Sequence, residues 1–473
     1  RLIRVSPSNY ETELDNAVLL NYALGPKAQR LKHKDICESG SKGVVVPRPQ
    51  YASCHKEALS DYTEGIMDLV LLDDSIVDYY GKPEMVFFGP DEGTAPLMDE
   101  VAYNVRDRGY QHWRTITTGK SFGIPHDTYG LLTSGKTFGL FDRGEEGVDL
   151  QVEGNSLMVT SNMDEIYGEI GEDIEISGMT TASVMSSFRT LINHYGAKEE
   201  ELNLMITGGP DGDLGANQIQ CYKGRICLII DGGSILFDPA GLDRTELKKL
   251  AFKRNSVPRI NSLGFPVGKL SCRGFMVPIG GHNLTLPDGT VVEDGALFHR
   301  NFLSDLANRK YIEEAGIRAF IPCGGFKDTV NQTNVRRFVD LFSELQFIVE
   351  GANVFFDDAA RRFIATKTKI KQIKDTTANK GGVFSSSIAE VLTAFLLGDS
   401  YESDLLNDRA TRWALTSDVR ELVSRYGTME TGLLLRLYDA DRSVPLFELS
   451  EKSSEQIFSL QDRLELMCAD IVA

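Results

Sequence analysis

The sequence predicts an α/β protein of at least two domains, and three observations support this prediction. Apolar runs of strand length alternate with helical patterns through the second half of the chain, which favours a parallel sheet. At 473 residues the chain is long enough for two to four domains, each with its own core. After residue 381 the pattern is strongly helical to the end of the chain.

Composition and charge limit the kinds of partner. Apolar residues make up 42% and charged residues 25%, which is ordinary for folded soluble proteins. The 50 basic and 68 acidic side chains give a formal charge of -18, which repels polyanions. We therefore expect neither nucleic acid nor an anionic membrane as the main partner, and local groups must hold any phosphate ligand.

Cysteine usage and the start of the chain bear on its compartment. Seven cysteines are scattered singly without a CxxC pair, so we predict free thiols, no metal site, and a reducing compartment such as the cytoplasm or the mitochondrial matrix. No run of about 18 apolar residues occurs and the first ten residues lack a signal-peptide core, so no membrane span is predicted. Because the first residue is Arg1, we expect the chain to begin inside a longer polypeptide or after processing.

The first part of the chain is predicted to mix helices with short strands. Helical patterns cover 15–24 and 94–108, and a buried strand is predicted at 85–88. The glycine- and threonine-rich stretch 117–139 reads as a loop, with a helix beginning near His126. Residues 141–178 are acidic and predict a small antiparallel insertion.

The second half alternates strands with helices. The predicted strands are 202–207, 225–231, 318–322 and 347–350, and the predicted helices are 243–252, 303–315 and 334–341. The predicted domains are a first α/β domain at 1–135, an insertion at 136–180, a parallel-sheet domain at 181–385, and C-terminal helices at 386–473 that pack back on the first domain.

A glycine-rich turn is the strongest candidate for a binding site. The predicted strand at 202–207 runs directly into Gly208, Gly209, Gly212 and Gly215, and a helix is expected to follow. Glycines let the backbone approach a pyrophosphate, whose charge is met by amides at a helix N-terminus. The spacing GGxxGxxG departs from GxGxxG, so the context counts for more than the spacing. We predict a Rossmann-type dinucleotide site, with a tight turn without ligand as the alternative.

Asp231 ends the next apolar strand, about 20 residues further on, where dinucleotide sites place an acid that accepts the ribose hydroxyls. Its carboxylate would repel a 2′-phosphate, and no arginine or lysine follows in DGGSILFDP. We therefore predict NAD as the cofactor in preference to NADP. The alternative is a structural acid at a strand end.

Three residues of the first domain are candidates for acid–base chemistry. Lys42 lies between small residues in SGSKG, where desolvation could lower its pKa and let it act as an acid or base. Asp99 could work opposite this lysine as a proton shuttle. His126 is either catalytic or structural. Taken singly, each is also explained as an ordinary surface or structural group.

Seven segments occur in an order that resembles the glutamate dehydrogenases: SGSKG, GPDEGTAPLMDE, TTGKSFGIPHDTYG, TGGPDGDLGANQI, FIPCGGFKDTVNQTN, VEGANVFF and ANKGGVFSSSIAEV. Within that family, GGPDGDLG, SGSKGV and IPHDTYG resemble the large-subunit NAD-dependent branch, in which a long N-terminal extension precedes the catalytic region. The resemblance covers residues 1 to about 400 and is weakest at 136–180 and 253–300. It implies an amino-acid dehydrogenase with a substrate domain and a Rossmann-type NAD-binding domain.

The resemblance also implies roles for individual residues. Lys42 takes the place of the catalytic lysine and Asp99 that of the proton-transferring aspartate. Thr128 would lie near cofactor and substrate, and Ser386 would hold the side-chain carboxylate of glutamate. The expected cofactor-binding residues are Gly209, Gly212, Asp213, Leu214, Asp231 and Asn353, of which Asn353 resembles the asparagine near the nicotinamide ribose and carboxamide.

A lysine that binds the substrate carboxylate in this family has three rival candidates here. Arg30, Lys32 and Lys34 all lie in the right part of the chain, and we favour Lys34. Another substrate lysine of the smaller enzymes falls at or just before Arg1, so the chain as numbered would lack part of its pocket.

The expected reaction is NAD-dependent oxidative deamination of L-glutamate to 2-oxoglutarate and ammonia. One alternative is a dehydrogenase for an apolar amino acid, against which Ser386 argues. The other is a nucleotide-sensing regulatory module without turnover, against which the presence of both Lys42 and Asp99 argues. A homo-oligomer is expected, with a tetramer favoured by the large-subunit resemblance and a hexamer possible.

Overall fold

The computed structural model describes residues 2–3, 5, 10–23, 43–77, 81, 84–89, 97–117, 141–143, 148–152, 155–159, 178–252 and 261–472. The chain divides into two compact units. Unit 1 comprises Arg1–Tyr129, Thr133–Phe141 and Gly382–Arg420, and unit 2 comprises Gly130–Leu132, Asp142–Gly381 and Glu421–Ala473.

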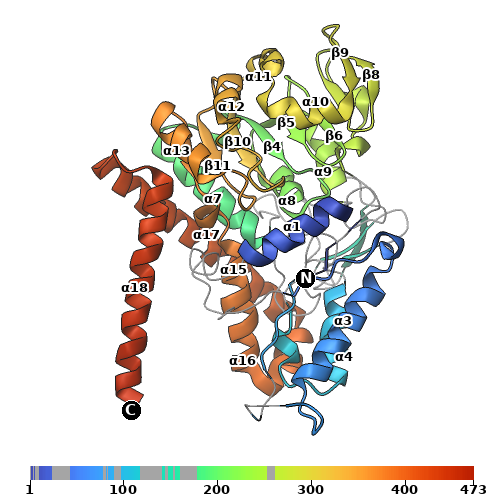
Figure 1. Cartoon of the computed structure of the whole chain (residues 1–473), viewed down its shortest axis with the longest axis vertical. Helices are drawn as coiled ribbons and strands as arrows, with labels where there is room; N and C mark the ends of the chain where they lie inside the picture. The colour runs from blue at the N-terminus through green and yellow to red at the C-terminus, as the bar shows by residue number, and fades with distance from the viewer. Residues whose placement is uncertain are drawn as a thin grey trace. The chain divides into compact units, whose positions relative to one another are not determined.

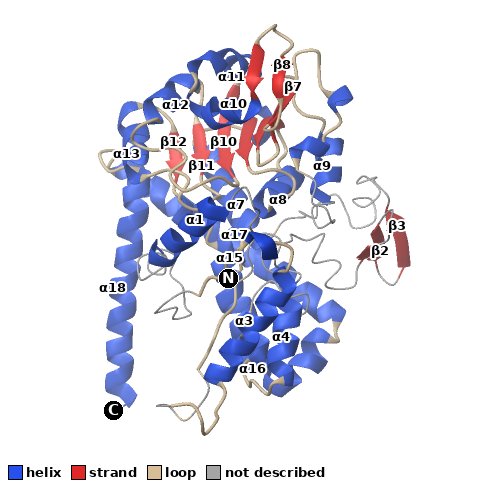
Figure 2. Ribbon diagram, turned by 45° about the vertical axis from the view of Figure 1, so that its right-hand side comes forward, coloured by secondary structure: helices blue, strands red, loops and turns tan. Residues whose placement is uncertain are grey.

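Unit 1 is built around a pair of helices, α3 (His55–Val70) and α4 (Met98–Asp107) (Figure 2). The buried positions of α4 are Met98, Val101, Ala102 and Val105, the spacing of one helical face. Its other described elements are α1 (Tyr10–Ala23), the 3₁₀ turns η1 (Pro49–Tyr51) and η3 (Trp113–Thr115), α15 (Gly381–Phe384, whose first residue belongs to unit 2), the π-helix η9 (Ser385–Leu392), α16 (Thr393–Leu397), η10 (Gly398–Ser400) and η11 (Glu402–Leu406).

The predicted strand at 85–88 does not form. Phe88 makes a single parallel bridge to Thr117, with its amide donating to the carbonyl of Ile116 at 2.6 Å. The preceding backbone is bound by a side chain, because the hydroxyl of Tyr110 donates to the Glu84 carbonyl at 2.8 Å and accepts from the Val86 amide at 3.0 Å. An apolar run can be buried without a neighbouring strand, so periodicity alone did not distinguish the two cases.

Unit 2 contains a seven-stranded sheet in the order β12-β11-β10-β4-β5-β6-β7. The first five strands in this order are parallel, and β6 and β7 continue the sheet antiparallel. The strands are β4 (Asn203–Thr207), β5 (Arg225–Ile230), β6 (Ser234–Phe237), β7 (Phe275–Pro278), β10 (Ile317–Pro322), β11 (Phe347–Val349) and β12 (Lys371–Ile373).

Both faces of this sheet are buried by helices (Figure 1). Leu204 and Ile206 of β4 belong to one core cluster and Met205 to the other, because successive side chains of a strand point to opposite faces. Helices of the first cluster are α7 (Met179–His194), α8 (Asp213–Cys221) and α9 (Arg244–Phe252); those of the second are α11 (Arg309–Ala315), α12 (Val335–Leu341) and α13 (Asp358–Lys367).

Two small antiparallel sheets accompany the main one. β1 (Phe141–Arg143), β2 (Val148–Val152) and β3 (Asn155–Val159) form a three-stranded sheet, in which β2 and β3 pair antiparallel as predicted for the insertion. β8 (His282–Thr285) and β9 (Val291–Asp294) form a hairpin next to α10 (Gly295–Asn301). The predicted helix at 303–315 is instead two 3₁₀ turns, η7 (Phe302–Ser304) and η8 (Leu306–Asn308), followed by α11.

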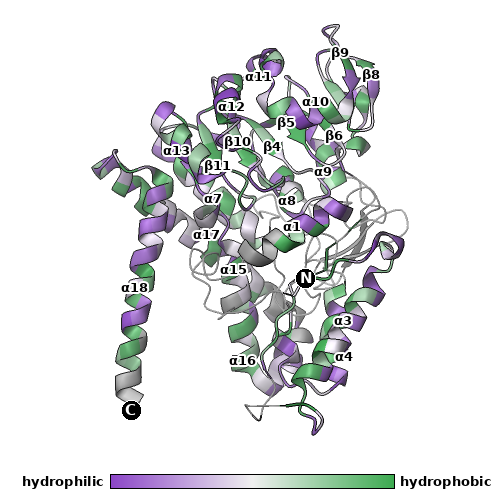
Figure 3. Ribbon diagram, viewed as in Figure 1, coloured by the Kyte–Doolittle hydropathy of each residue, from purple (hydrophilic) through white to green (hydrophobic). Residues whose placement is uncertain are grey.

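The C-terminal helices are divided differently from the prediction. We expected 386–473 to pack entirely on the first domain, but 421–473 belongs to unit 2. Apolar packing explains this division. Leu434 and Leu435 of α17 (Arg409–Ala440) and Leu446 of α18 (Leu446–Val472) join the core of the parallel-sheet domain. Figure 3 shows α18 alternating between hydrophilic and hydrophobic segments, and its later apolar residues are exposed, among them Ile457, Leu460 and Leu464.

One helical run, Asp375–Ser400, is long and apolar enough to cross a membrane by length and composition. The sequence-based prediction that no segment qualifies was too strict, because it required an uninterrupted apolar run, whereas this run has a high mean hydropathy despite its small polar residues. The core helix of a soluble protein meets the same criterion, and 38% of the apolar window is buried. The observation is weak evidence for a membrane span.

Candidate active site

The glycine turn lies where the carboxyl ends of the parallel strands meet. β4 ends at Thr207 and α8 begins at Asp213, with residues 208–212 forming the turn between them. The turn is tied to both neighbouring strands: the amide of Gly208 donates to the Ile230 carbonyl of β5 at 2.8 Å, and the hydroxyl of Thr207 donates to the Gly324 carbonyl after β10 at 2.6 Å. This is the place where open α/β sheets bind ligands.

Three glycines in this turn are required by the geometry. Gly208 has φ +83, and a Cβ on it would lie 2.8 Å from the backbone nitrogen of Gly324. A Cβ on Gly209 would collide with the carboxylate of Asp231, and a Cβ on Gly215 would collide with the carbonyl oxygen of Gly209. Three of the four glycines in the pattern GGxxGxxG therefore make close approaches, two to backbone atoms and one to the Asp231 carboxylate. Dinucleotide sites use their glycines for such close approaches.

The N-terminus of α8 directly follows this turn. Gly212 is the N-cap residue in an extended conformation, and no side chain caps the helix there. The first helical residues are Asp213 and Leu214, both predicted to bind the cofactor. Uncapped amides at a helix N-terminus, together with the helix dipole, suit the negative charge of a pyrophosphate. The residues present thus fit the predicted dinucleotide.

Asp231 follows the end of β5 and lies against Gly209, as the dinucleotide prediction requires. It is 6% exposed. Its Oδ1 accepts from the amides of Gly233 at 2.8 Å and Ser234 at 3.1 Å and from the hydroxyl of Ser262 at 2.6 Å, and its Oδ2 accepts from the Ser262 amide at 2.8 Å. These bonds fix the position of the carboxylate, and Oδ2, with one such donor, is the oxygen on the Gly209 side.

The predicted nicotinamide-side residue, Asn353, lies in the loop that follows β11. The amide of Ala352 in this loop donates to the Pro322 carbonyl at the end of β10 at 2.7 Å. A Cβ on Gly351 would approach the side chain of Leu214 to 3.5 Å, so the loop adjoins the start of α8. The structure therefore brings Asn353, Leu214 and the glycine turn to one edge of the sheet.

Asn379 is a residue of this site that the sequence analysis did not single out, although it lies within the segment ANKGG. Its side-chain nitrogen donates to the Gly351 carbonyl and to Oδ1 of Asn353, both at 2.9 Å. Asn379 is 5% exposed. A buried asparagine is uncommon unless its polar atoms are bound. An asparagine next to Ala378, in a segment that carries the family resemblance, was the available signal.

In unit 1, Asp99 occupies the first turn of α4 and is half-buried. Its charge contributes to the raised pKa of Tyr103 one turn later, second to the burial of that tyrosine. The neighbouring Glu100 points to Lys56 of α3, with which it forms an ion pair of 2.7 Å. The two adjacent acids of α4 therefore have different surroundings.

Ser386, also in unit 1, lies in the π-helix η9 and is half-buried. Its hydroxyl donates to the Gly382 carbonyl at 2.9 Å, and the adjacent buried Ser385 makes an equivalent bond to the same carbonyl at 2.9 Å. π-helical segments are rare and occur frequently at functional sites. η3 packs against this segment within the unit.

Comparison with known proteins relates a segment of the chain to a known family. Residues 175–398, which include the glycine turn, Asn353 and Ser386, match the family described as Glutamate/Leucine/Phenylalanine/Valine dehydrogenase. This segment of the chain is therefore similar to that dehydrogenase family. The two-domain α/β fold class predicted from the sequence is confirmed.

Curated relatives resemble nearly the whole chain but are much longer. Glutamate dehydrogenase 2 of Dictyostelium discoideum is 37% identical over 407 residues, which are 84% of this chain and 33% of that protein. The NAD-specific glutamate dehydrogenase of Neurospora crassa is 32% identical over 477 residues, which are 97% of this chain and 39% of that protein. The chain thus spans only between a third and two fifths of the length of these relatives.

Solved structures share the fold. Plasmodium falciparum glutamate dehydrogenase 2 superposes with a TM-score of 0.54 at 11% identity, covering 93% of this chain and 73% of that one. A second structure, described as glutamate dehydrogenase, superposes with a TM-score of 0.52 at 12% identity, covering 97% of this chain and 79% of that one.

Several residues to which the dehydrogenase resemblance assigns roles lie outside the described residues. They are the catalytic candidate Lys42 and the substrate candidates Lys34, Arg30, Lys32 and Thr128. His126, a candidate from the sequence pattern alone, also lies outside the described residues. The predicted pairing of Lys42 with Asp99 therefore stays a prediction. On the cofactor side, all six predicted residues are described, and Gly209, Leu214, Asp231 and Asn353 are joined by the contacts given above.

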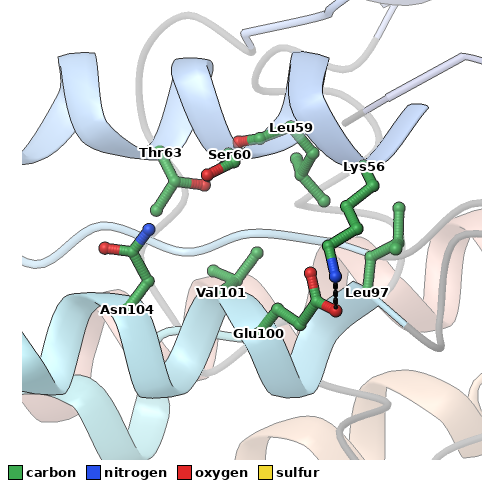
Figure 4. A pocket seen from close by; sticks show the side chains of 8 residues that line it. All are labelled: Lys56, Leu59, Ser60, Thr63, Leu97, Glu100, Val101 and Asn104. Atoms are coloured by element: carbon green, nitrogen blue, oxygen red, sulfur yellow. Dashed lines mark hydrogen bonds and ion pairs between the residues drawn. The ribbon is translucent and has the colours of Figure 1, made fainter. Parts of the chain in front are cut away.

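A small pocket between α3 and α4 does not belong to the predicted site. Figure 4 shows it lined by both helices, with the Lys56–Glu100 ion pair at one end. Its volume of about 20 Å³ has room for a single water molecule. Asp99 does not line this pocket, so the pocket adds nothing to the acid–base chemistry expected of the family.

Proposed function

We propose that this chain catalyses the oxidative deamination of L-glutamate to 2-oxoglutarate and ammonia with NAD as the hydride acceptor. The observation that carries the proposal is the glycine turn packed against Asp231 at the carboxyl ends of β4 and β5. Relatives named NAD-specific glutamate dehydrogenase, at 32% identity over 97% of the chain in the Neurospora crassa case, support the choice of reaction.

The choice of NAD over NADP is supported by Asp231. A 2′-phosphate on the adenosine ribose would be placed near a buried carboxylate that four hydrogen bonds hold in position. Bound NAD would supply the redox chemistry by accepting a hydride from the α-carbon of glutamate. The protein's part is to hold the dinucleotide on the amides of α8 and to orient its nicotinamide through the Asn353 loop.

The proton transfers are assigned to unit 1. The α-amino group must be neutral before hydride leaves the α-carbon, and Asp99 would take its proton. Lys42 would then remove a proton from the water that attacks the imine carbon. Loss of ammonia completes the reaction and leaves 2-oxoglutarate. Ser386 would bind the γ-carboxylate, and Lys34 and Thr128 complete the proposed substrate site.

A steady-state assay of the chain tests the proposal directly. The absorbance of reduced NAD is followed with glutamate, and then with leucine in place of glutamate and NADP in place of NAD. Turnover of glutamate with NAD, without turnover of leucine or turnover with NADP, supports the proposal. Turnover of leucine but not glutamate would assign the chain to the apolar amino acids, and coenzyme binding without any turnover would indicate a regulatory module.

A Lys42→Ala variant tests the proposed acid–base role. Deamination should be abolished while the dissociation constant for reduced NAD stays within about twofold of the original, because the lysine lies outside the dinucleotide turn. Retained turnover would remove Lys42 from the mechanism. We further propose a homo-oligomer, with a tetramer favoured, in the cytoplasm or mitochondrial matrix. The mass in solution, measured by light scattering, decides between tetramer and hexamer.

A further inference from the structure

The loop that carries Asn353 contains a strained backbone. Val354, the next residue, has φ +52, in the left-handed region. A β-branched residue rarely adopts this conformation, because its Cβ crowds the following carbonyl oxygen. Strain of this kind persists where surrounding contacts hold it, and it concentrates at binding and catalytic sites.

The contact that holds Val354 comes from Asp375. The amide of Val354 donates to Oδ2 of Asp375 at 2.7 Å, and Oδ1 of the same carboxylate accepts from the Thr376 amide at 2.7 Å. Asp375 is 3% exposed, and its carboxylate lies 3.6 Å from the guanidinium of Arg361. A hydrogen bond to a buried, charged acceptor is among the stronger ones in proteins. Asp375 therefore opposes the strain directly.

The same helical turn binds the other end of the loop. Asp375 begins α14 (Asp375–Ala378), and the amide of Asn379 donates back to the Asp375 carbonyl at 2.9 Å. The side chain of Asn379 donates to Gly351 and to Oδ1 of Asn353, as described above. One turn of helix thus fixes the backbone on both sides of Asn353 and the orientation of its amide.

We propose that Asp375 is a positioning residue that holds the loop 351–354 in the shape in which Asn353 meets the nicotinamide half of the coenzyme. This inference rests on the proposed function. Asp375 itself need not touch the coenzyme. Its effect should be confined to the nicotinamide end, because Gly209 and Asp231 at the adenosine end are held by bonds from other residues.

The test compares Asp375→Asn with Asp358→Asn. Both substitutions remove one negative charge beside Arg361, but Asp358 contacts Arg361 and Lys374 and makes no bond to the loop. Binding of NADH and of ADP, which lacks the nicotinamide half, is measured by fluorescence and calorimetry. In Asp375→Asn we expect the dissociation constant for NADH to rise about tenfold, the effect of one lost hydrogen bond. Its constant for ADP, and both constants in Asp358→Asn, should change less than about twofold.

A second variant guards against a merely structural effect. Glycine adopts positive φ without strain, so Val354→Gly should let the loop keep its shape with less help from Asp375. Combined with Asp375→Asn, it should restore NADH binding to within about threefold of Val354→Gly alone.

Three results would overturn the inference: unchanged NADH binding in Asp375→Asn, equal losses for NADH and ADP, or the same loss in Asp358→Asn. A chain that binds no NADH before any substitution would contradict the proposed function itself, and the inference with it. That outcome is distinguishable from the other three.

Discussion

The guanidinium of Arg361 meets the carboxylate of Glu350 through two hydrogen bonds, from Nε to Oε1 at 2.9 Å and from Nη2 to Oε2 at 2.6 Å. The side chains are 4% and 0% exposed. Gln372 adds a third bond to Oε1 at 2.9 Å. Burial raises the pKa of Glu350 to about 7, although Arg361 acts in the opposite direction. The pair joins β11, which leads into the Asn353 loop, to α13 and β12.

Replacing Arg361 by methionine should destabilise the protein by about 3–5 kcal/mol at neutral pH, because a buried carboxylate loses its partner. Without Arg361, the folded-state pKa of Glu350 rises further above its unfolded value of about 4.3. Stability contributed by such a group is complete below the unfolded pKa and is lost as the pH rises through the folded pKa.

Urea denaturation at about pH 5 and about pH 8 checks this prediction. The loss in Arg361→Met should be larger at the higher pH, and the double variant Glu350→Leu/Arg361→Met should recover much of the stability. A loss that is equal at both pH values would contradict the assignment to an unpaired Glu350.

Gly209→Ala should weaken NADH binding by at least about tenfold, because the added methyl group displaces the Asp231 carboxylate from the turn. Gly232→Ala is the matched control. Gly232 directly follows Asp231 in the sequence, and a Cβ on it has no atom within 4 Å. Dissociation constants from fluorescence titration decide the matter. Equal dissociation constants for the two variants would mean that the glycine turn is not part of the coenzyme site.

Ser386→Ala should raise the KM for glutamate about 10- to 100-fold, the effect of losing one hydrogen bond to a charged carboxylate. Ser385→Ala removes the same kind of hydroxyl, with the same bond to the Gly382 carbonyl, one residue earlier. Its KM should stay near that of the original chain. If both serines gave the same KM, the effect would belong to the π-helix and not to substrate recognition.

Asp288 should make unfolding sensitive to acid. Burial acts to raise its pKa, but hydrogen bonds from Lys310, Thr290 and Tyr311 together hold the pKa well below its usual range. A carboxyl with a lowered folded-state pKa contributes stability above its unfolded pKa of about 3.9, and that stability is lost as the pH falls below this value.

Asp288→Asn removes this titration. Between about pH 4 and pH 2 the variant should therefore lose stability less steeply than the original chain, by up to about 1.4 kcal/mol for each pH unit. Thermal or urea unfolding across this range measures the slopes. If the free energy of unfolding changed equally with pH in the variant and in the original chain, Asp288 would not be the titrating group.

The geometry of the glycine turn was predictable from the sequence because the residues that form it lie at the ends of two neighbouring strands. Gly208 and Gly209 follow a buried strand directly, and Asp231 ends the next one, so parallel pairing of β4 with β5 brings them together without further information. The strands at 203–207 and 225–230 agree with the predicted runs within one residue.

What the sequence could not reveal depends on contacts between distant segments. Asp375 lies 21 residues from Val354 and outside the segments that carry the family resemblance, so the hydrogen bond between the two residues had no signal in the pattern. The positive φ of Val354 was likewise hidden, since valine normally indicates extended strand. The division of 386–473 between the two units depends on which partner covers each apolar position, and helical periodicity does not identify the partner.

The thiol of Cys323 can serve as a chemical reporter of local opening at the edge of the sheet that carries the proposed coenzyme site. Cys323 directly follows β10, its amide bonds to the Thr207 carbonyl at 2.7 Å, and burial raises the pKa of its thiol. Thiolates are the form that alkylating reagents attack, so this sulfur can be modified only when the strand ends separate and admit solvent. The rate at which a maleimide labels Cys323 would therefore report the rate of local opening at this edge of the sheet. A dinucleotide bound at the Gly208 turn would lower that labelling rate.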